Sequence, residues 1–164
     1  MCEATGTTQV NAYGNYTFYF LPWSVAGQTS ITFNVSGCGT SCFLNVLLSS
    51  AASYPCSGAQ TYLVGLSASA ALTTAFIYPR LGVFAGSVAF SSTYWVSWIG
   101  GVISVGSGPV VGQGPSIVSY TDPVPSAVNF VAFSSNPSPI SYFVFVPGVL
   151  RDLVLLFCFC CSLT

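Results

Sequence analysis

Apolar and polar side chains alternate in short segments along most of the chain. The clearest is SITFNVSG (30–37), with Ile31, Phe33 and Val35 on one face and polar side chains on the other. A period of two is typical of a β-strand that buries one face. Strand-like patterns occupy residues 16–22, 30–37, 42–50, 60–69, 73–79, 86–92, 93–99, 102–106, 116–120, 127–135 and 140–146. Glycine, proline and serine separate them, which predicts an all-β, antiparallel β-sandwich or jelly-roll-like domain of about 8–10 short strands.

The segment TYWVSWIGGVISVG (93–106) also predicts a strand register. A two-residue turn at 100–101 places Trp95 opposite Gly106. The more apolar face, which we expect to point into the core, carries Val96, Trp98, Ile103 and Val105. Trp95 lies on the mixed face, where two interpretations stand. Its ring covers the glycine or a neighbouring loop, or it forms a binding platform.

Charge is scarce in this chain. Charged residues make up 3% of 164 residues, against about 25% in ordinary soluble domains. They are Glu3, Arg80, Asp122, Arg151 and Asp152, and the chain has neither lysine nor histidine. The lack of a basic patch makes nucleic acid a poor partner, because counterion release needs clustered cations. The lack of histidine removes the commonest general base and metal ligand.

The length predicts one domain, expected over residues 15–146. An irregular lead-in over 1–14 precedes it, without the charged and apolar regions of a signal peptide. An apolar tail over 147–164 follows, and its LVLLFCFCC is about half a membrane span. Four interpretations of this tail stay open. It could form a short helix, begin a truncated membrane segment, be a gene-model artefact, or act as an anchor S-acylated at Cys158, Cys160 and Cys161. A membrane is expected as a partner only if the tail is genuine and acylated or truncated.

The remaining cysteines indicate disulfides. The candidates are Cys2, Cys38, Cys42 and Cys56. Four cysteines allow three pairings, and the sequence does not choose among them. N-glycosylation sequons begin at Asn15 and Asn34. Together these features favour an extracellular or cell-surface location. The alternative is a zinc site formed by Cys38, Cys42 and Cys56, although neither CxxC spacing nor a histidine supports it.

Asp122 is the only carboxylate of the predicted domain, and it precedes a proline. Such a step forms an Asx turn, in which the carboxylate caps backbone N–H groups. A ligand or calcium contact is the alternative, although calcium prefers several carboxylates. Paired-carboxylate catalysis lacks its second member, and the serines lack a histidine to activate them. Arg80 is the only cation of the domain. It is expected to be a solvated loop residue, and the alternatives are that it pairs with Asp122 or binds the carboxylate of a ligand.

The strings YWVSWIGGVISVGSG and YTDPVPSAVNFVAFSS carry a further signal. The informative positions are Trp95, Ser97, Trp98, Gly101, Ile103, Val105, Gly106 and Gly108, followed by Asp122, Pro123, Pro125, Val128, Val131 and Phe133. In this spacing, residues 94–134 resemble the conserved half of the farnesoic acid O-methyltransferase domain family. The resemblance implies a compact β-sandwich that recurs in extracellular multidomain proteins, often beside adhesion or carbohydrate-binding modules.

The family name implies S-adenosylmethionine-dependent O-methylation of a terpenoid acid. No cofactor motif supports this, since residues 106–108 lead into Pro109 rather than a helix. We therefore expect a non-catalytic binding module, without cofactor or metal, for a neutral glycan or protein surface. The candidate contacts are Trp95, Asp122, Asn129 and Arg80. The alternatives are the methyltransferase activity and a self-associating matrix or filament subunit.

Overall fold

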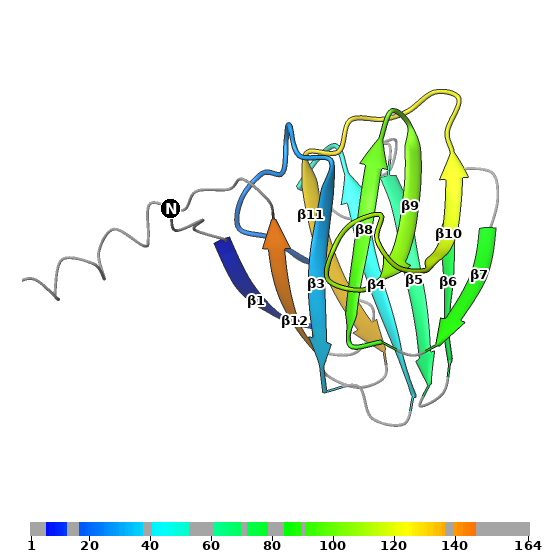
Figure 1. Ribbon diagram of the computed structural model, residues 1–164. Helices are drawn as coiled ribbons and strands as arrows, with labels where there is room; N and C mark the ends of the chain where they lie inside the picture. Colours follow the sequence, from blue (N-terminus) through cyan, green and yellow to red (C-terminus); the bar gives the residue numbers. More distant parts are fainter. Residues whose placement is uncertain are drawn as a thin grey trace, which may run out of the picture.

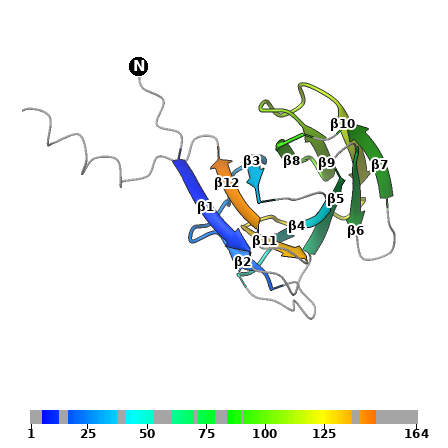
Figure 2. The same cartoon turned by 90° about the horizontal axis from the view of Figure 1, so that it is seen from below.

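The described residues form β-strands in two layers (Figures 1 and 2). The computed structural model describes residues 6–12, 17–37, 41–52, 61–69, 72–78, 84–89, 91–136 and 140–146. The strands are β1 (Gly6–Ala12), β2 (Tyr19–Phe20), β3 (Ser30–Ser36), β4 (Ser41–Ser49), β5 (Thr61–Ser69), β6 (Leu72–Tyr78), β7 (Phe84–Ala89), β8 (Thr93–Ile99), β9 (Val102–Ser107), β10 (Ser116–Thr121), β11 (Phe130–Asn136) and β12 (Ile140–Val146). This part of the chain contains no helix long and apolar enough to cross a membrane.

Each layer is a 6-stranded antiparallel sheet. Sheet A has the order β1-β12-β3-β8-β9-β10, and sheet B has the order β2-β11-β4-β5-β6-β7. At one edge the sheets approach each other, where β10 lies near β6 and β7 (Figure 2). The all-β sandwich prediction is confirmed.

The strand inventory differs from the prediction at the N-terminal side. The predicted irregular lead-in contains β1, which pairs with β12 from Gly6 opposite Val146 to Ala12 opposite Ile140. Its sequence, GTTQVNA, has one large aliphatic residue and therefore no alternation to detect. Within the segment predicted at 16–22, only two residues pair as β2. The described chain thus has twelve strands rather than eight to ten. The predicted tail at 147–164 lies outside the described residues.

Aromatic rings fill the space between the sheets. Phe33 and Tyr142 of sheet A contact Phe133 of sheet B, with ring centroids 5.4 and 4.6 Å from its own. The Tyr142 hydroxyl donates to the Ser134 backbone carbonyl at 2.6 Å. A buried tyrosine needs such a partner, because an unpaired hydroxyl in an apolar interior is costly. Tyr142 therefore joins the two sheets as well as filling the core.

Cys42 lies on the core face of β4 with 1% of its surface exposed. Its sulfur is disulfide-bonded, and every other cysteine of the chain lies outside the described residues. A sulfur in a disulfide is not a zinc thiolate, so the zinc alternative loses this ligand. The choice of partner among Cys2, Cys38 and Cys56 stays a prediction.

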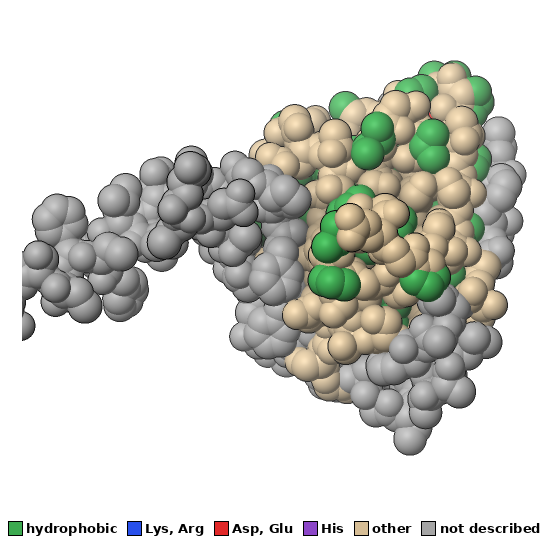
Figure 3. Space-filling model, in the orientation of Figure 1, with side chains coloured by type: hydrophobic (Ala, Val, Ile, Leu, Met, Phe, Trp, Pro, Cys, Tyr) green, Lys and Arg blue, Asp and Glu red, His purple; other side chains and the backbone are tan. Residues whose placement is uncertain are grey.

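The surface over sheet A carries hydrophobic and uncharged side chains (Figure 3). Of the five charged residues in the sequence, only Asp122 belongs to the described part. Contacts on this surface therefore depend on hydroxyls, amides, backbone groups and apolar side chains.

Candidate binding face

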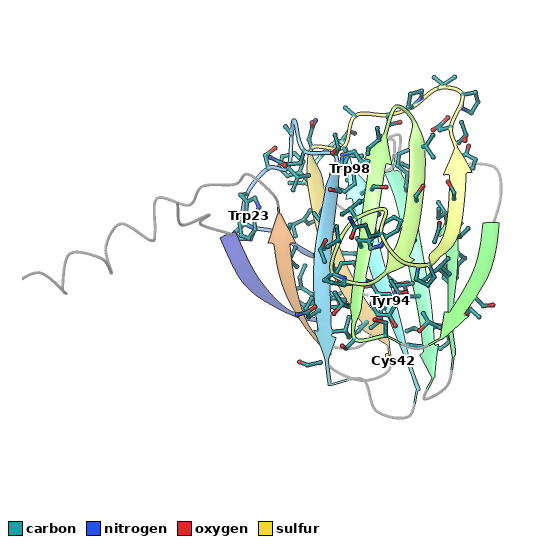
Figure 4. All side chains as sticks on the ribbon, in the orientation of Figure 1. Trp23, Cys42, Tyr94 and Trp98 are labelled. Carbon is teal, nitrogen blue, oxygen red and sulfur yellow. The ribbon has the colours of Figure 1, made fainter. Side chains whose placement is uncertain are left out.

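The hairpin of β8 and β9 has the predicted register. Gly100 and Gly101 form its turn with φ of +58° and +82°, as a primed two-residue turn requires. Trp98 points inward, and its Nε1–H donates to the Gln28 carbonyl at 2.8 Å. Figure 4 shows it near the loop that precedes β3, whereas Tyr94 lies toward the other end of the sandwich. The predicted core neighbours of Trp98 are buried: Val96, Ile103 and Val105.

Trp95 occupies the outward face of sheet A and is nevertheless only 3% exposed. It lies over Gly106, because a Cβ on that glycine would be 2.1 Å from Cζ2 of the indole. The ring therefore covers the glycine, as one of the two interpretations predicted, and offers no open face for stacking. Its buried Nε1–H has no hydrogen-bond partner in the described part of the chain.

The β9–β10 loop, residues 108–115, arches over this outward face (Figures 1 and 2). The Gly108 N–H donates to the Thr93 carbonyl at 2.9 Å, and the Ser107 N–H donates to the Pro115 carbonyl at 3.1 Å. Gly114 has a φ of +90°, and a Cβ there would lie 2.7 Å from the Ser107 carbonyl oxygen. The loop consequently returns closely along the end of β9, beside the covered indole.

Uncharged polar side chains surround Trp95 on this side of sheet A. We call them the hydroxyl face: Ser30, Thr32, Asn34, Thr93, Ser97, Ser104 and Ser119. Thr32 is the direct cross-strand partner of Trp95. The Thr93 hydroxyl donates to Asn34 Oδ1 at 2.8 Å, and the Ser104 and Ser119 hydroxyls share a hydrogen bond of 2.9 Å. Ser30, Thr32 and Ser97 are buried, so the members that can exchange hydrogen bonds with another molecule, without net charge, are the half-buried or exposed ones: Asn34, Thr93, Ser104 and Ser119.

Asp122 forms the predicted Asx turn at the end of β10. Its Oδ1 accepts the Val124 N–H at 2.8 Å, and its Oδ2 accepts the Tyr62 hydroxyl at 2.6 Å. Tyr62 also accepts the Ser126 N–H at 3.1 Å. Burial, and secondarily the hydrogen bond to Asp122, raise the pKa of Tyr62. Tyr62 could not be identified from the sequence, since no local pattern relates β5 to the turn after β10.

Asn129 is held by backbone neighbours. Its Nδ2 donates to the Ser50 carbonyl at 3.2 Å, and its own carbonyl accepts the Val25 N–H at 2.8 Å and the Ser24 hydroxyl at 2.9 Å. Asp122 and Asn129 belong to the β10–β11 connection, whereas Trp95 belongs to the middle of β8, so the candidates do not form one cluster. The candidate contact Arg80, the cysteines Cys2, Cys38 and Cys56, and the sequon residue Asn15 lie outside the described residues.

The side chains of the hydroxyl face are uncharged. Asp122 is the only Asp or Glu in the described ranges, and both of its oxygens accept hydrogen bonds from the protein. Those ranges contain no group of three His, Cys, Asp or Glu that could hold a metal ion. The chemistry offered around Trp95 is therefore the exchange of neutral hydrogen bonds.

No family model and no curated protein match this chain. Solved structures with the same fold include two glycoside-hydrolysing proteins. A β-glucanase of Bacillus licheniformis superposes with a TM-score of 0.52 at 10% identity, over 87% of this chain and 78% of its own. A protein described as a native glycosidic hydrolase superposes with a TM-score of 0.52 at 8% identity, over 88% of this chain and 80% of its own. At such identities the likeness shows the β-sandwich fold alone, and the resemblance of residues 94–134 stays a prediction.

Proposed function

We propose that this protein is a non-catalytic, extracellular recognition module that binds a neutral glycan on the hydroxyl face. The observation that carries the proposal is the Trp95 indole, whose Nε1–H is buried among uncharged polar side chains without an acceptor. A buried donor left unpaired costs about 1–3 kcal/mol. The Nε1 atom is closed to solvent under residues 108–115, so an acceptor oxygen of a ligand would remove that cost when the ligand displaces this loop.

The ligand class follows from the chemistry of the face. Its side chains are hydroxyls and one amide, which exchange hydrogen bonds with other hydroxyls and attract neither anions nor cations. A neutral glycan presents many hydroxyls in a fixed spacing. The β-sandwich shared with a β-glucanase and a glycosidic hydrolase supports a glycan over other neutral ligands.

A binding role is favoured over catalysis by the arrangement of acids. Glycoside hydrolysis commonly needs two carboxyl groups flanking the scissile bond. Asp122 is engaged with Tyr62 and Val124, in the turn after β10 and away from the middle of β8. The disulfide-bonded Cys42 and the Asn34 sequon support an extracellular setting.

The proposal is tested with a panel of soluble neutral oligosaccharides of different linkage, measured by calorimetry on folded, unglycosylated protein. Trp95→Phe keeps a ring over Gly106 and removes the indole donor. We expect affinity for the bound oligosaccharide to fall about 5- to 30-fold, as for one lost hydrogen bond of about 1–2 kcal/mol. Trp98→Phe removes an indole donor that is already paired with the Gln28 carbonyl, on the opposite face of β8 from Trp95, so it should leave the affinity unchanged.

Two results would count against the proposal. Folded wild-type protein that binds no member of the panel would remove the glycan role. Equal affinities for wild type and Trp95→Phe would move the site away from the hydroxyl face. A protein ligand, self-association and methyl transfer stay predictions of the sequence.

A further inference from the structure

We infer that an N-glycan at Asn34 closes the hydroxyl face, so that glycosylation and binding of a separate ligand exclude each other. This inference rests on the proposed function and concerns the regulation of that same site. It arises from the place of one sequon residue in β3, the strand that pairs with β8.

The register places Asn34 beside Trp95. Thr32 and Asn34 are alternate residues of β3, so they share the outward face about 7 Å apart. Thr32 is directly opposite Trp95, and Asn34 is directly opposite Thr93. Asn34 is therefore the diagonal cross-strand neighbour of Trp95, within reach of an elongated substituent. The first two sugars of an N-glycan are longer than this separation.

The side-chain geometry leaves the correct atom open to modification. Asn34 Oδ1 accepts the Thr93 hydroxyl at 2.8 Å, which orients the amide. N-glycosylation uses Nδ2, which has no hydrogen-bond partner among the described residues. Asn34 is half-buried, and Ser36, the hydroxyl residue of the sequon, is exposed. A sugar on Nδ2 can thus be carried by the folded strand, and it would begin on the hydroxyl face itself.

The attached glycan would present the chemistry of the proposed ligand. Its sugars carry hydroxyl and acetamide groups without charge, which suit the same side chains. A tethered group competes at an effective concentration of about a millimolar. It would therefore displace a weakly bound free oligosaccharide, in addition to covering the surface.

The full chain is produced in a cell that attaches N-glycans, and in a bacterial periplasm that does not. Mass spectrometry of peptides determines whether Asn34 is occupied, and calorimetry measures affinity for the oligosaccharide that the unglycosylated protein binds. Ser36→Ala removes the sequon and keeps the Asn34–Thr93 hydrogen bond. Thr17→Ala is the matched control, because it removes the other sequon, at Asn15.

We expect the glycosylated wild type and glycosylated Thr17→Ala to bind at least tenfold more weakly than the unglycosylated protein. Ser36→Ala from the glycosylating cell should bind as tightly as the unglycosylated protein. An unoccupied Asn34, or equal affinities with and without its glycan, would overturn this inference and leave the proposed function intact. Failure of the unglycosylated protein to bind any neutral oligosaccharide would overturn both.

Discussion

Replacing Gly106 with alanine should displace the Trp95 ring on the outward face of sheet A and lower the free energy of unfolding. The added Cβ would lie 2.1 Å from Cζ2 of Trp95 and 2.8 Å from the Pro115 carbonyl oxygen. Carbon atoms prefer separations of about 3.5–4.0 Å, so both neighbours would have to move. Trp95 is 3% exposed, so its ring cannot move outward without displacing residues 108–115. Overpacking of this kind costs about 1–3 kcal/mol.

Gly65→Ala is the matched substitution on sheet B. There the added Cβ would lie 1.9 Å from Cζ of Phe76, another ring that covers a glycine on an outward face. Phe76 is half-buried, so its ring can turn toward solvent. Replacing glycine with alanine also lowers the conformational entropy of the unfolded chain, which adds about 0.4–1 kcal/mol to the free energy of unfolding. We expect Gly65→Ala to lower the free energy of unfolding by less than half as much as Gly106→Ala.

Urea unfolding of both variants and the wild type measures the difference, with midpoints compared at a common m-value. A loss of about 1–3 kcal/mol corresponds to a fall in Tm of roughly 2–12 °C for a chain of this length. In a Trp95→Leu background, Gly106→Ala should cost less, which gives a coupling energy of about 1 kcal/mol or more. Wild-type stability of Gly106→Ala, or equal losses at both glycines, would refute the steric argument.

The remaining predictions concern the turns at the ends of β8 and β10. Tyr62→Phe deprives the Asp122 carboxylate of a donor and should cost about 1–2 kcal/mol at neutral pH in urea unfolding. Because the pKa of Tyr62 is raised in the folded protein, its contribution is present below the unfolded pKa of about 10 and is lost as pH rises through the folded pKa. The free energy of unfolding should therefore fall above about pH 10, and less steeply in Tyr62→Phe, as a pH series of unfolding curves would show. Gly100→Ala should cost about 1–2 kcal/mol through its φ of +58° alone. Gly101→Ala should lower the Tm further, since its Cβ would also lie 3.1 Å from atoms of the 122–125 loop.

The hairpin of residues 93–106 could be predicted in full because its determinants are local. Two adjacent glycines define the turn, and alternation on either side of it then determines which residues face each other. The same reasoning placed Ile31 and Phe33 in the core, where both are fully buried. Local alternation also predicts most of the strands. It does not predict β1, because that strand has no alternating pattern of its own and forms by pairing with β12.

What lies over an outward face could not be predicted from alternation. Thr32, directly opposite Trp95, and Ser97, two residues after Trp95 on β8, face outward and are nevertheless buried. The path of residues 108–115 over this face follows from tertiary contacts, such as the Gly108–Thr93 hydrogen bond, rather than from the strand pattern. The bond between Tyr62 and Asp122 was missed for a similar reason, since it joins residues sixty positions apart.

Stability and binding measurements on Trp95→Phe separate a packing defect from a ligand site. The buried hydroxyls of Tyr142 and Tyr94 are paired within the fold, with the Ser134 carbonyl and with the Thr73 hydroxyl. Removing an unpaired donor recovers about 1–3 kcal/mol, which offsets the packing lost with the smaller ring. Both explanations therefore expect a variant of nearly wild-type stability, and only a ligand site expects its affinity to fall.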